Sequence, residues 1–327
     1  MDVDESGLPL GQVQQSRQEV QDLLLGHLAA SGARPLPVRR AYSGPVAEFP
    51  RSDLGVCARE ADTACRETAS MSFAIALSDE QWELVADLFD PPGRRGAPAQ
   101  ISRRTMVEAM LFLARTGCQW RYLPERYGSW TAVWAQWRRW RANGVWAAAM
   151  TRLAAVVRLL HGREPVPSMV MVDAQTVKGG RYGPTFHEAG GRGGRTIGTK
   201  RTLLVEILGL PIAARADSAR PHDVVAAREL LRDRLADLPR VHAIVGDRAY
   251  RGLVKLAERK NVTLDIKAPP RGTTGFTPLW PLYKVEHAIA QLGRWRRLSR
   301  CYEGTTASAR AWLEVASVGY LAWRASI

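Results

Sequence analysis

Apolar and polar positions recur at helical spacing between residues 78 and 143, and start and stop signals divide this stretch into three helices. Ser78 is an N-cap for the first helix, whose apolar residues are Trp82, Val85, Leu88 and Phe89. Ser102 begins the second helix, which stops near Gly117, and the third covers 129–143. Seven of the 11 tryptophans lie between residues 82 and 146, so we predict a small all-helical module with an aromatic core.

After His161 the pattern changes to short apolar runs separated by turns, which is typical of β-strands mixed with helices. The predicted elements are strands over 169–175, 202–208 and 211–217, a helix over 223–235, a strand over 242–246, a helix over 252–259, a strand over 262–267 and a helical region from about 282. Three strands, helix, strand, helix, strand, helix is the order of a ribonuclease-H-like core. The predicted fold class is mixed α+β and α/β: a ribonuclease-H-like mixed sheet flanked by helices, preceded by the helical module.

The charge of the chain is unevenly distributed. The whole sequence has 46 Lys and Arg against 32 Asp and Glu, a formal charge of +14, but residues 1–70 hold only 7 of the basic and 10 of the acidic residues. These first 70 residues also lack tryptophan, so we expect a poorly ordered extension that adds little to a core. The basic remainder makes nucleic acid the first partner to consider.

Cysteines and long apolar segments narrow the class of protein further. The four cysteines (Cys57, Cys65, Cys118 and Cys301) form no C-x-x-C pair, so neither a zinc knuckle nor a disulfide framework is predicted. The longest apolar runs fall well short of the roughly 20 residues that cross a bilayer, and the first residues are acidic. We expect no membrane segment, no signal peptide and a cytoplasmic protein.

Three carboxylates occupy positions where a charge is costly. Asp173 lies inside an apolar strand, Asp247 ends the next isolated strand, and Glu286 lies in the last helical region. Three converging carboxylates would suit Mg²⁺, and two such ions about 3.5–4 Å apart can drive phosphodiester transfer. The alternative is structural: the two aspartates cap strand ends or form salt bridges, and Glu286 is a solvated charge.

The sequence around these carboxylates resembles the DDE transposases of bacterial insertion sequences, specifically the insertion-sequence-five family, over nearly all of residues 77–324. In the helical module the resemblance is carried by residues 77–82, 116–121, 137–140 and 144–146. In the second part it is carried by DAQTVK from Asp173, DRAY from Asp247 and VEH around Glu286, followed by Arg296-Arg297-Leu298. Leu282 stands where the family commonly has Arg, and Lys284 could supply that positive charge.

The resemblance implies a domain organisation, a cofactor and partners. It implies a helix-turn-helix-like DNA-binding domain over 71–161 and a ribonuclease-H-like catalytic domain over 162–327. Asp173, Asp247 and Glu286 would be the catalytic residues and the ligands of Mg²⁺ or Mn²⁺, with two ions. The implied partner is double-stranded DNA, both the terminal inverted repeats of the element and the target DNA. The sequence leaves open whether the protein forms a homo-oligomer on the DNA.

Basic residues near these motifs are the candidate DNA contacts. They are Arg138, Arg139 and Arg141 on the outer face of helix 129–143, Lys178, Lys200 and Arg201 beside the first catalytic strand, and Lys284, Arg296 and Arg297. The tryptophans of helix 129–143 are expected in the core, and the Gly- and Arg-rich stretch 190–198 is expected to be a flexible basic loop. Tyr250 could position Asp247, touch DNA or simply pack.

Three functions are compatible with these features. A transposase explains both the carboxylates and the positive charge. A non-catalytic DNA-binding protein, such as a helix-turn-helix regulator or an inactive transposase derivative, explains the charge but leaves the three carboxylates without a role. A ribonuclease-H-like nuclease without strand transfer would use the same metal chemistry, and only the family resemblance favours transposition over it.

Overall fold

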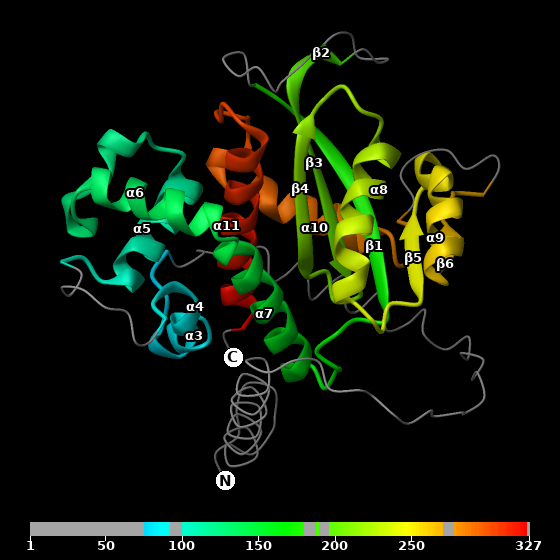
Figure 1. The fold of residues 1–327 in the computed structure, drawn as a ribbon, viewed down its shortest axis with the longest axis horizontal. Helices are drawn as coiled ribbons and strands as arrows, with labels where there is room; N and C mark the ends of the chain where they lie inside the picture. Colours follow the sequence, from blue (N-terminus) through cyan, green and yellow to red (C-terminus); the bar gives the residue numbers. More distant parts are fainter. Residues whose placement is uncertain (1–74, 92–99, 180–187, 190–195, 271–277, 326–327) are drawn as a thin grey trace. The chain divides into compact units, whose positions relative to one another are not determined.

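The computed structural model describes residues 75–91, 100–179, 188–189, 196–270 and 278–325, so the expected extension over 1–70 lies outside the described residues. Residues 74–327 form one compact unit. Its first part is helical (Figure 1) and contains α3 (Asp79–Glu83), α4 (Ala86–Phe89), α5 (Arg103–Thr116), α6 (Trp130–Ala142) and α7 (Val145–Leu160), with 3-10 turns at Trp120–Tyr122 and Glu125–Tyr127. Among the described residues, no helix has the length and apolarity that crossing a bilayer requires.

Two of the predicted helix starts, Ser78 and Ser102, are confirmed by their caps. Ser78 forms a capping box: its Oγ accepts from the Gln81 N–H at 3.2 Å, and the Gln81 side chain accepts from the Ser78 N–H at 2.8 Å. Ser102 Oγ accepts from the Thr105 N–H at 3.0 Å, and α5 ends at Gly117 with a left-handed φ of 71°. The single helix predicted from Ser78 to Phe89 is instead two short helices, α3 and α4, which are separated at Leu84 and Val85.

Aromatic side chains fill the core of the helical part. Trp137 and Trp140 are each 4% exposed, and Phe89 meets Trp140 edge-on at a centroid distance of 4.9 Å. Trp312, which belongs to the last helix α11 (Thr306–Arg324), stacks on Trp137 at 5.3 Å. On α6 the prediction that the tryptophans belong to the core is confirmed for Trp137 and Trp140, whereas Trp130 is half-buried and Trp134 is 38% exposed.

The second part is built on a mixed sheet whose main strands follow one another along the chain in the predicted order. Its strands are β1 (Met169–Lys178), the two-residue β2 (Glu188–Ala189), β3 (Thr196–Glu206), β4 (Pro211–Ser218), β5 (Ala243–Gly246) and β6 (Thr263–Ile266). The order is β2-β3-β1-β5-β6, and β4 also pairs with β3. β3 is antiparallel to β1 and β4, whereas β5 is parallel to both β1 and β6. This arrangement confirms the ribonuclease-H-like core.

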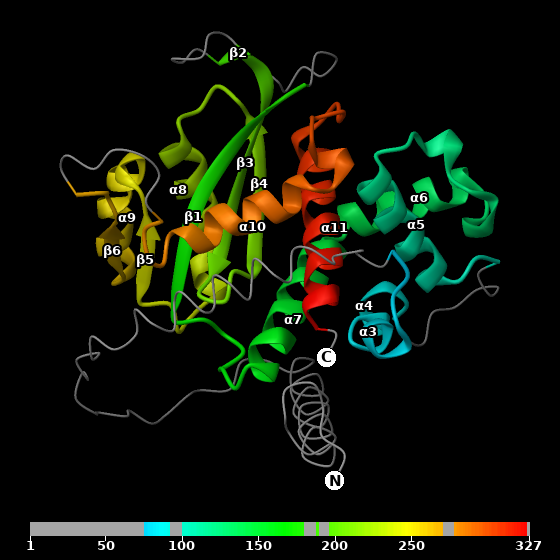
Figure 2. The same ribbon diagram turned by 180° about the vertical axis from the view of Figure 1, so that it is seen from behind.

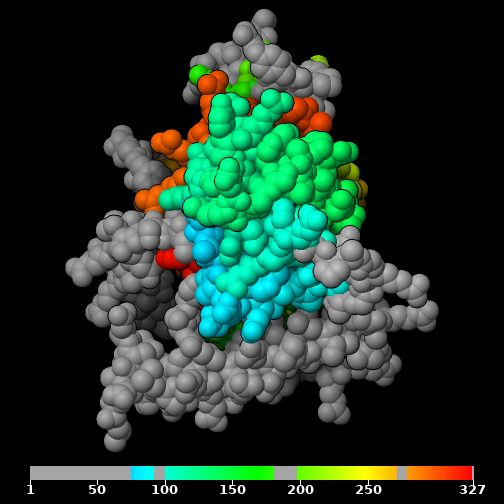
Figure 3. Space-filling view, turned by 90° about the vertical axis from the view of Figure 1, so that its left-hand side faces the viewer, coloured from blue at the N-terminus to red at the C-terminus, as the bar shows by residue number. Residues whose placement is uncertain are grey.

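Helices cover both faces of the sheet. α8 (Asp223–Arg234) lies on the face seen in Figure 1, and α10 (Tyr283–Gly293) crosses the strands on the opposite face, seen in Figure 2. α9 (Val254–Lys260) lies beside β6, and α11 contacts α5, α6, α7 and β4. Figure 3 shows the face formed by the helical part, coloured cyan to green. One C-terminal helix thus contributes to the core of both parts.

The β1–β3 ladder is longer than predicted. β1 continues to Lys178 and β3 begins at Thr196, six residues before the predicted start, and the ladder extends to the pair Lys178–Gly198. Residues 196–198, predicted to be loop, therefore belong to a strand, while 190–195 lie outside the described residues. The apolar pattern missed this extension because β3 carries polar side chains from Thr199 to Thr202, all of them buried.

Candidate active site

Asp173 projects from β1 just beyond the strand that runs parallel to it. The β1–β5 pairing ends at Met171 and Val245, so Asp173 lies two residues past the last pair. Its half-buried carboxylate accepts two hydrogen bonds at Oδ1, from the Ala174 N–H at 2.7 Å and from the Tyr250 hydroxyl at 3.2 Å. A carboxylate at this sheet edge is therefore held by the protein but remains reachable.

Asp247 follows β5 directly and caps the 3-10 turn Arg248–Leu253. Its Oδ1 accepts from the Ala249 N–H at 2.8 Å, and its carbonyl accepts from the Tyr250 N–H at 3.1 Å. A Cβ at Gly246 would lie 2.9 Å from the Cβ of Tyr250, so the turn closes tightly only because residue 246 is glycine. The aspartate side chain itself is exposed at the end of the strand.

Glu286 is an exposed residue in the first turn of α10, the helix that crosses β1 and β3 (Figure 2). The pKa of Asp173 is raised to about 6, chiefly by burial and in smaller part by the charges of Asp247 and Glu286, against the opposing hydrogen bonds from Ala174 and Tyr250. Asp247 and Glu286 therefore lie near enough to Asp173 to repel its charge. The structure brings all three predicted carboxylates into one electrostatic environment.

The three carboxylates suit a divalent cation by their chemistry, although the residues that the structure describes form no closed set of ligands. Carboxylate oxygens are the ligands that Mg²⁺ and Mn²⁺ prefer, and a cation would offset the repulsion that raises the pKa of Asp173. In the described part of the chain, however, no group of three or more His, Cys, Asp or Glu side chains already has an arrangement that could hold a metal ion. Convergence within a two-metal span thus stays a prediction.

Lys200 and Arg201 were predicted to contact phosphates, but both side chains are buried. Lys200 is 5% exposed; its Nζ lies 2.5 Å from Asp223 Oδ1 and also donates to the Pro221 carbonyl. Arg201 is 6% exposed, donates to the carbonyls of Leu298 and Arg300, and has its pKa lowered to about 10 by burial. Because β3 lies between β1 and β4 with helices on both faces, its cations serve the fold.

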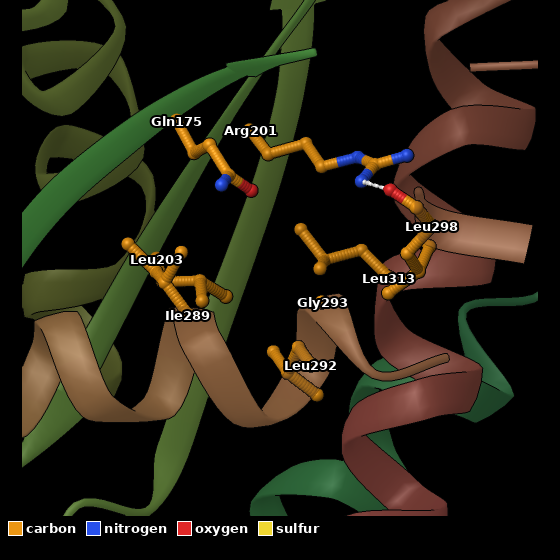
Figure 4. Close-up of a pocket in the computed structure, with 8 residues that line it drawn as sticks. All are labelled: Gln175, Arg201, Leu203, Ile289, Leu292, Gly293, Leu298 and Leu313. Atoms are coloured by element: carbon orange, nitrogen blue, oxygen red, sulfur yellow. Dashed lines mark hydrogen bonds between the residues drawn. The ribbon is translucent and has the colours of Figure 1, made fainter. Parts of the chain in front are cut away.

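Figure 4 shows the small pocket into which Arg201 extends, on the α10 face of the sheet. Gln175 of β1, the cross-strand partner of Arg201, lies beside it, and the guanidinium reaches across to the Leu298 carbonyl. The rest of the lining is mostly apolar, from Leu203, Ile289, Leu292, Gly293, Leu298 and Leu313. Arg201 thereby ties the sheet to the segment that follows α10.

The candidate DNA contacts divide into exposed and internal cations. Arg138, Arg139, Lys178 and Arg296 are exposed, and the Arg138 guanidinium lies 4.9 Å from the ring of Trp134. Arg141 points inward and donates to the Ser308 hydroxyl of α11. Arg297 pairs with Glu303 at 2.7 Å, and its guanidinium lies 4.2 Å from the ring centroid of Trp312. The prediction that Arg141 faces outward is wrong. Arg141 contacts α11, and Arg297 contacts both α11 and the segment just before it.

Lys284 and Tyr250 are two further residues that the sequence analysis singled out. Lys284 is half-buried between aromatic rings, 5.7 Å from Trp280 and 5.2 Å from Tyr283. Tyr250 donates its backbone N–H to the Asp247 carbonyl and its hydroxyl to Asp173. Its place three residues after Asp247 was the only sequence signal, and it could not reveal a partner on another strand.

Comparison with known proteins gives two adjoining family matches. Residues 77–150 match the family described as "Putative transposase of IS4/5 family", and residues 164–277 match "Transposase DDE domain". The second match includes Asp173 and Asp247, whereas Glu286 lies beyond it.

Two relatives are similar to part of the chain. The "Uncharacterized protein y4sN" of Sinorhizobium fredii (strain NBRC 101917 / NGR234) is 34% identical over 120 residues, which are 36% of this chain and 87% of that protein. The "Insertion element IS402 uncharacterized 16.2 kDa protein" of Burkholderia cepacia is 35% identical over 88 residues, which are 25% of this chain and 60% of that protein.

Proposed function

Because the chain belongs to the IS4/5 family of transposases and carries a transposase DDE domain, we propose that it binds the terminal inverted repeats of an insertion sequence, cleaves the DNA there with Mg²⁺ and joins the freed 3′-hydroxyl to target DNA. The observation that carries this proposal is the electrostatic environment of Asp173. Asp173 lies on β1, Asp247 directly follows the parallel neighbour β5, Glu286 lies on α10, and the charges of Asp247 and Glu286 act on Asp173.

Asp173, Asp247 and Glu286 would hold the divalent ions, Mg²⁺ or Mn²⁺, in this proposal. Two such ions would activate an attacking water or 3′-hydroxyl and stabilise the leaving oxygen. The chain's own residues fix the ligands: the Ala174 N–H and the Tyr250 hydroxyl hold Asp173, and the Ala249 N–H holds Asp247. Glu286 is on α10, a helix that contacts β1 and β3.

The exposed cations supply the DNA surface in this proposal. Arg138 and Arg139 lie on α6, Lys178 ends β1, and Arg296 follows α10, so both parts of the molecule offer phosphate contacts. Trp134 lies beside Arg138 and adds exposed aromatic area to the same helix. Lys200, Arg201, Arg141 and Arg297 serve the fold and are left out of the DNA-contact set.

The test is cleavage and joining of labelled DNA that carries the ends of the element, with Mg²⁺, with Mn²⁺ and with EDTA. Asp173→Asn and Asp247→Asn should each lower cleavage by several powers of ten while gel-shift affinity for the same DNA persists. Asp265→Asn is the matched control, because Asp265 is on the adjacent strand β6 and pairs with Lys267 at 2.8 Å. Its cleavage should equal that of the parent protein.

The possible outcomes separate the three candidate functions. Cleavage followed by joining supports a transposase, and cleavage without joining supports a nuclease of the same fold. Binding without metal-dependent cleavage would identify a non-catalytic DNA-binding protein. If Asp173→Asn cleaves as well as the parent, Asp173 is structural and the proposed mechanism is wrong.

A further inference from the structure

Tyr250 connects the two catalytic aspartates of the proposed function. Its hydroxyl donates to Asp173 Oδ1 at 3.2 Å, and its backbone N–H donates to the Asp247 carbonyl at 3.1 Å. The residue is 1% exposed, so neither hydrogen bond competes freely with solvent. One buried residue therefore contacts both the β1 carboxylate and the segment that carries the β5 carboxylate.

The hydrogen bonds on Asp173 are all on one oxygen. Oδ1 accepts from both Ala174 and Tyr250, and no hydrogen-bond donor among the residues that the structure describes reaches Oδ2. Two donors on one oxygen fix the rotation of a carboxylate, because turning it would break both bonds. The second oxygen is thereby left available for an outside partner.

The position of Tyr250 depends on the residues just before it. Asp247 caps the turn through the Ala249 N–H, and the absence of a side chain at Gly246 lets the tyrosine ring pack against the end of β5. The sequence Gly246-Asp247-Arg-Ala-Tyr250 thus builds a short turn that returns a hydroxyl to the neighbouring strand.

We propose that Tyr250 is a positioning residue that orients Asp173 through Oδ1, leaves Oδ2 for the divalent cation and fixes Asp173 relative to Asp247. The inference rests on the proposed function, because it assumes that the aspartates bind a cation. Groups that orient metal ligands typically contribute about 10- to 100-fold to metal affinity. Removing the hydroxyl should therefore weaken cation binding while the ring continues to support the turn.

The test measures Mn²⁺ binding by electron paramagnetic resonance on the full chain, with no DNA and no turnover. Tyr250→Phe keeps the ring against Gly246, and circular dichroism melting checks that the variant folds. We expect its Mn²⁺ affinity to fall about 10-fold, toward the loss seen with Asp173→Asn. Tyr320→Phe is the matched control, because it removes a buried hydroxyl that accepts from Arg324 on α11, and its Mn²⁺ affinity should equal that of the parent.

A double variant distinguishes orientation from general damage. If Tyr250 acts through Asp173, Tyr250→Phe should have little further effect on Mn²⁺ binding once Asp173→Asn is present. In DNA cleavage, the single Phe variant should need about 10-fold more Mg²⁺ for its half-maximal rate and should recover near-parental rates at saturation. A merely structural role would lower the maximal rate and leave the Mg²⁺ requirement unchanged.

Each negative result has a distinct meaning. If the parent binds Mn²⁺ through Asp173 and Tyr250→Phe binds it equally well, the inference about Tyr250 is wrong and the proposed function stands. If Asp173→Asn and the parent bind Mn²⁺ alike, the metal-dependent function fails, and the inference fails with it. A Phe variant whose Mn²⁺ affinity falls equally with and without Asp173→Asn also overturns the positioning role.

Discussion

Arg158 of α7 and Glu206 at the end of β3 form an ion pair inside the protein, with side chains 6% and 0% exposed. Glu206 also accepts from the N–H groups of Leu208 at 2.6 Å and Leu210 at 3.2 Å, in the turn before β4. Arg158 Nε donates to the Glu164 carbonyl at 2.7 Å. The pair therefore fastens the last helix of the helical part to the β3–β4 turn of the sheet.

Breaking this pair should destabilise the whole compact unit. Glu206→Gln leaves the Arg158 charge buried without its counter-ion, and such losses cost about 3–5 kcal/mol in free energy of unfolding. Urea unfolding followed by circular dichroism measures the change. The control Glu229→Gln removes the partner of Arg232 in a pair whose side chains are 36% and 50% exposed, so its effect should stay below about 1 kcal/mol. Equal effects of the two variants would contradict the structural role.

Stability should depend on pH through Glu314, a carboxylate on α11 that is 5% exposed. Burial raises its pKa to about 7, against the opposing charges of Arg310 and Arg234. Between pH 4.5 and about 7 the folded protein binds more protons at this site than the unfolded chain, so its contribution to stability falls as pH rises.

Glu314→Gln should remove this pH-dependent loss. The variant should gain on the parent as pH rises from 5 to 8, by about 2–3 kcal/mol at the upper end. Urea midpoints of both proteins at several pH values measure the difference. A difference that stays constant with pH would show that Glu314 keeps its ordinary ionisation in the folded protein.

Arg138 and Arg139 should contribute to DNA binding and leave the fold unchanged, because both are exposed on α6. Replacing both with Ala should weaken end binding and lower the slope of log affinity against log salt by about 2, since each phosphate contact contributes about 0.9. Gel shifts at two salt concentrations measure this.

A variant with Arg232→Ala and Arg240→Ala is the matched control for the same change in charge, because both arginines are 50% exposed and pair with acidic residues. It should keep most of the affinity. If the two double variants lose affinity equally, net charge and not α6 accounts for binding.

Gly246→Ala should disturb the candidate active site. The added Cβ would lie 2.9 Å from the Cβ of Tyr250, and overpacking of this kind costs about 1–3 kcal/mol in free energy of unfolding. Gly293→Ala at the end of α10 is the control, because its Cβ would meet nothing within 4 Å. That change should be neutral or stabilising by up to about 1 kcal/mol. Equal unfolding midpoints for the two variants would contradict the close contact.

Periodicity and caps predicted the element order because those signals are local. Ser78, Ser102 and Gly117 act on their own helices, and short apolar runs mark where most of the strands lie along the chain. The start of β3 could not be predicted in this way. Its residues Lys200 and Arg201 look like loop cations, and only their partners on α8 and after α10 explain their burial.

The candidate site shows the same limit. Asp173 and Asp247 could be identified because charges at strand ends are rare in the sequence pattern and a family motif surrounds them. Which arginines face solvent was not predictable from α6 alone: Arg138 and Arg141 are three residues apart, yet one lies beside exposed Trp134 and the other reaches α11. Arg141 faces inward because of α11, whose Ser308 lies 167 residues later in the chain.

The position of α11 has a consequence for biosynthesis. A ribosome makes this helix after α5, α6, α7 and β4, the elements it contacts, so a nascent chain holds Trp137 without its stacking partner Trp312 until residues 306–324 emerge. Aromatic surface left open in this way invites chaperones and aggregation. Trp137 and β4 therefore gain their α11 contacts only after residues 306–324 have been translated.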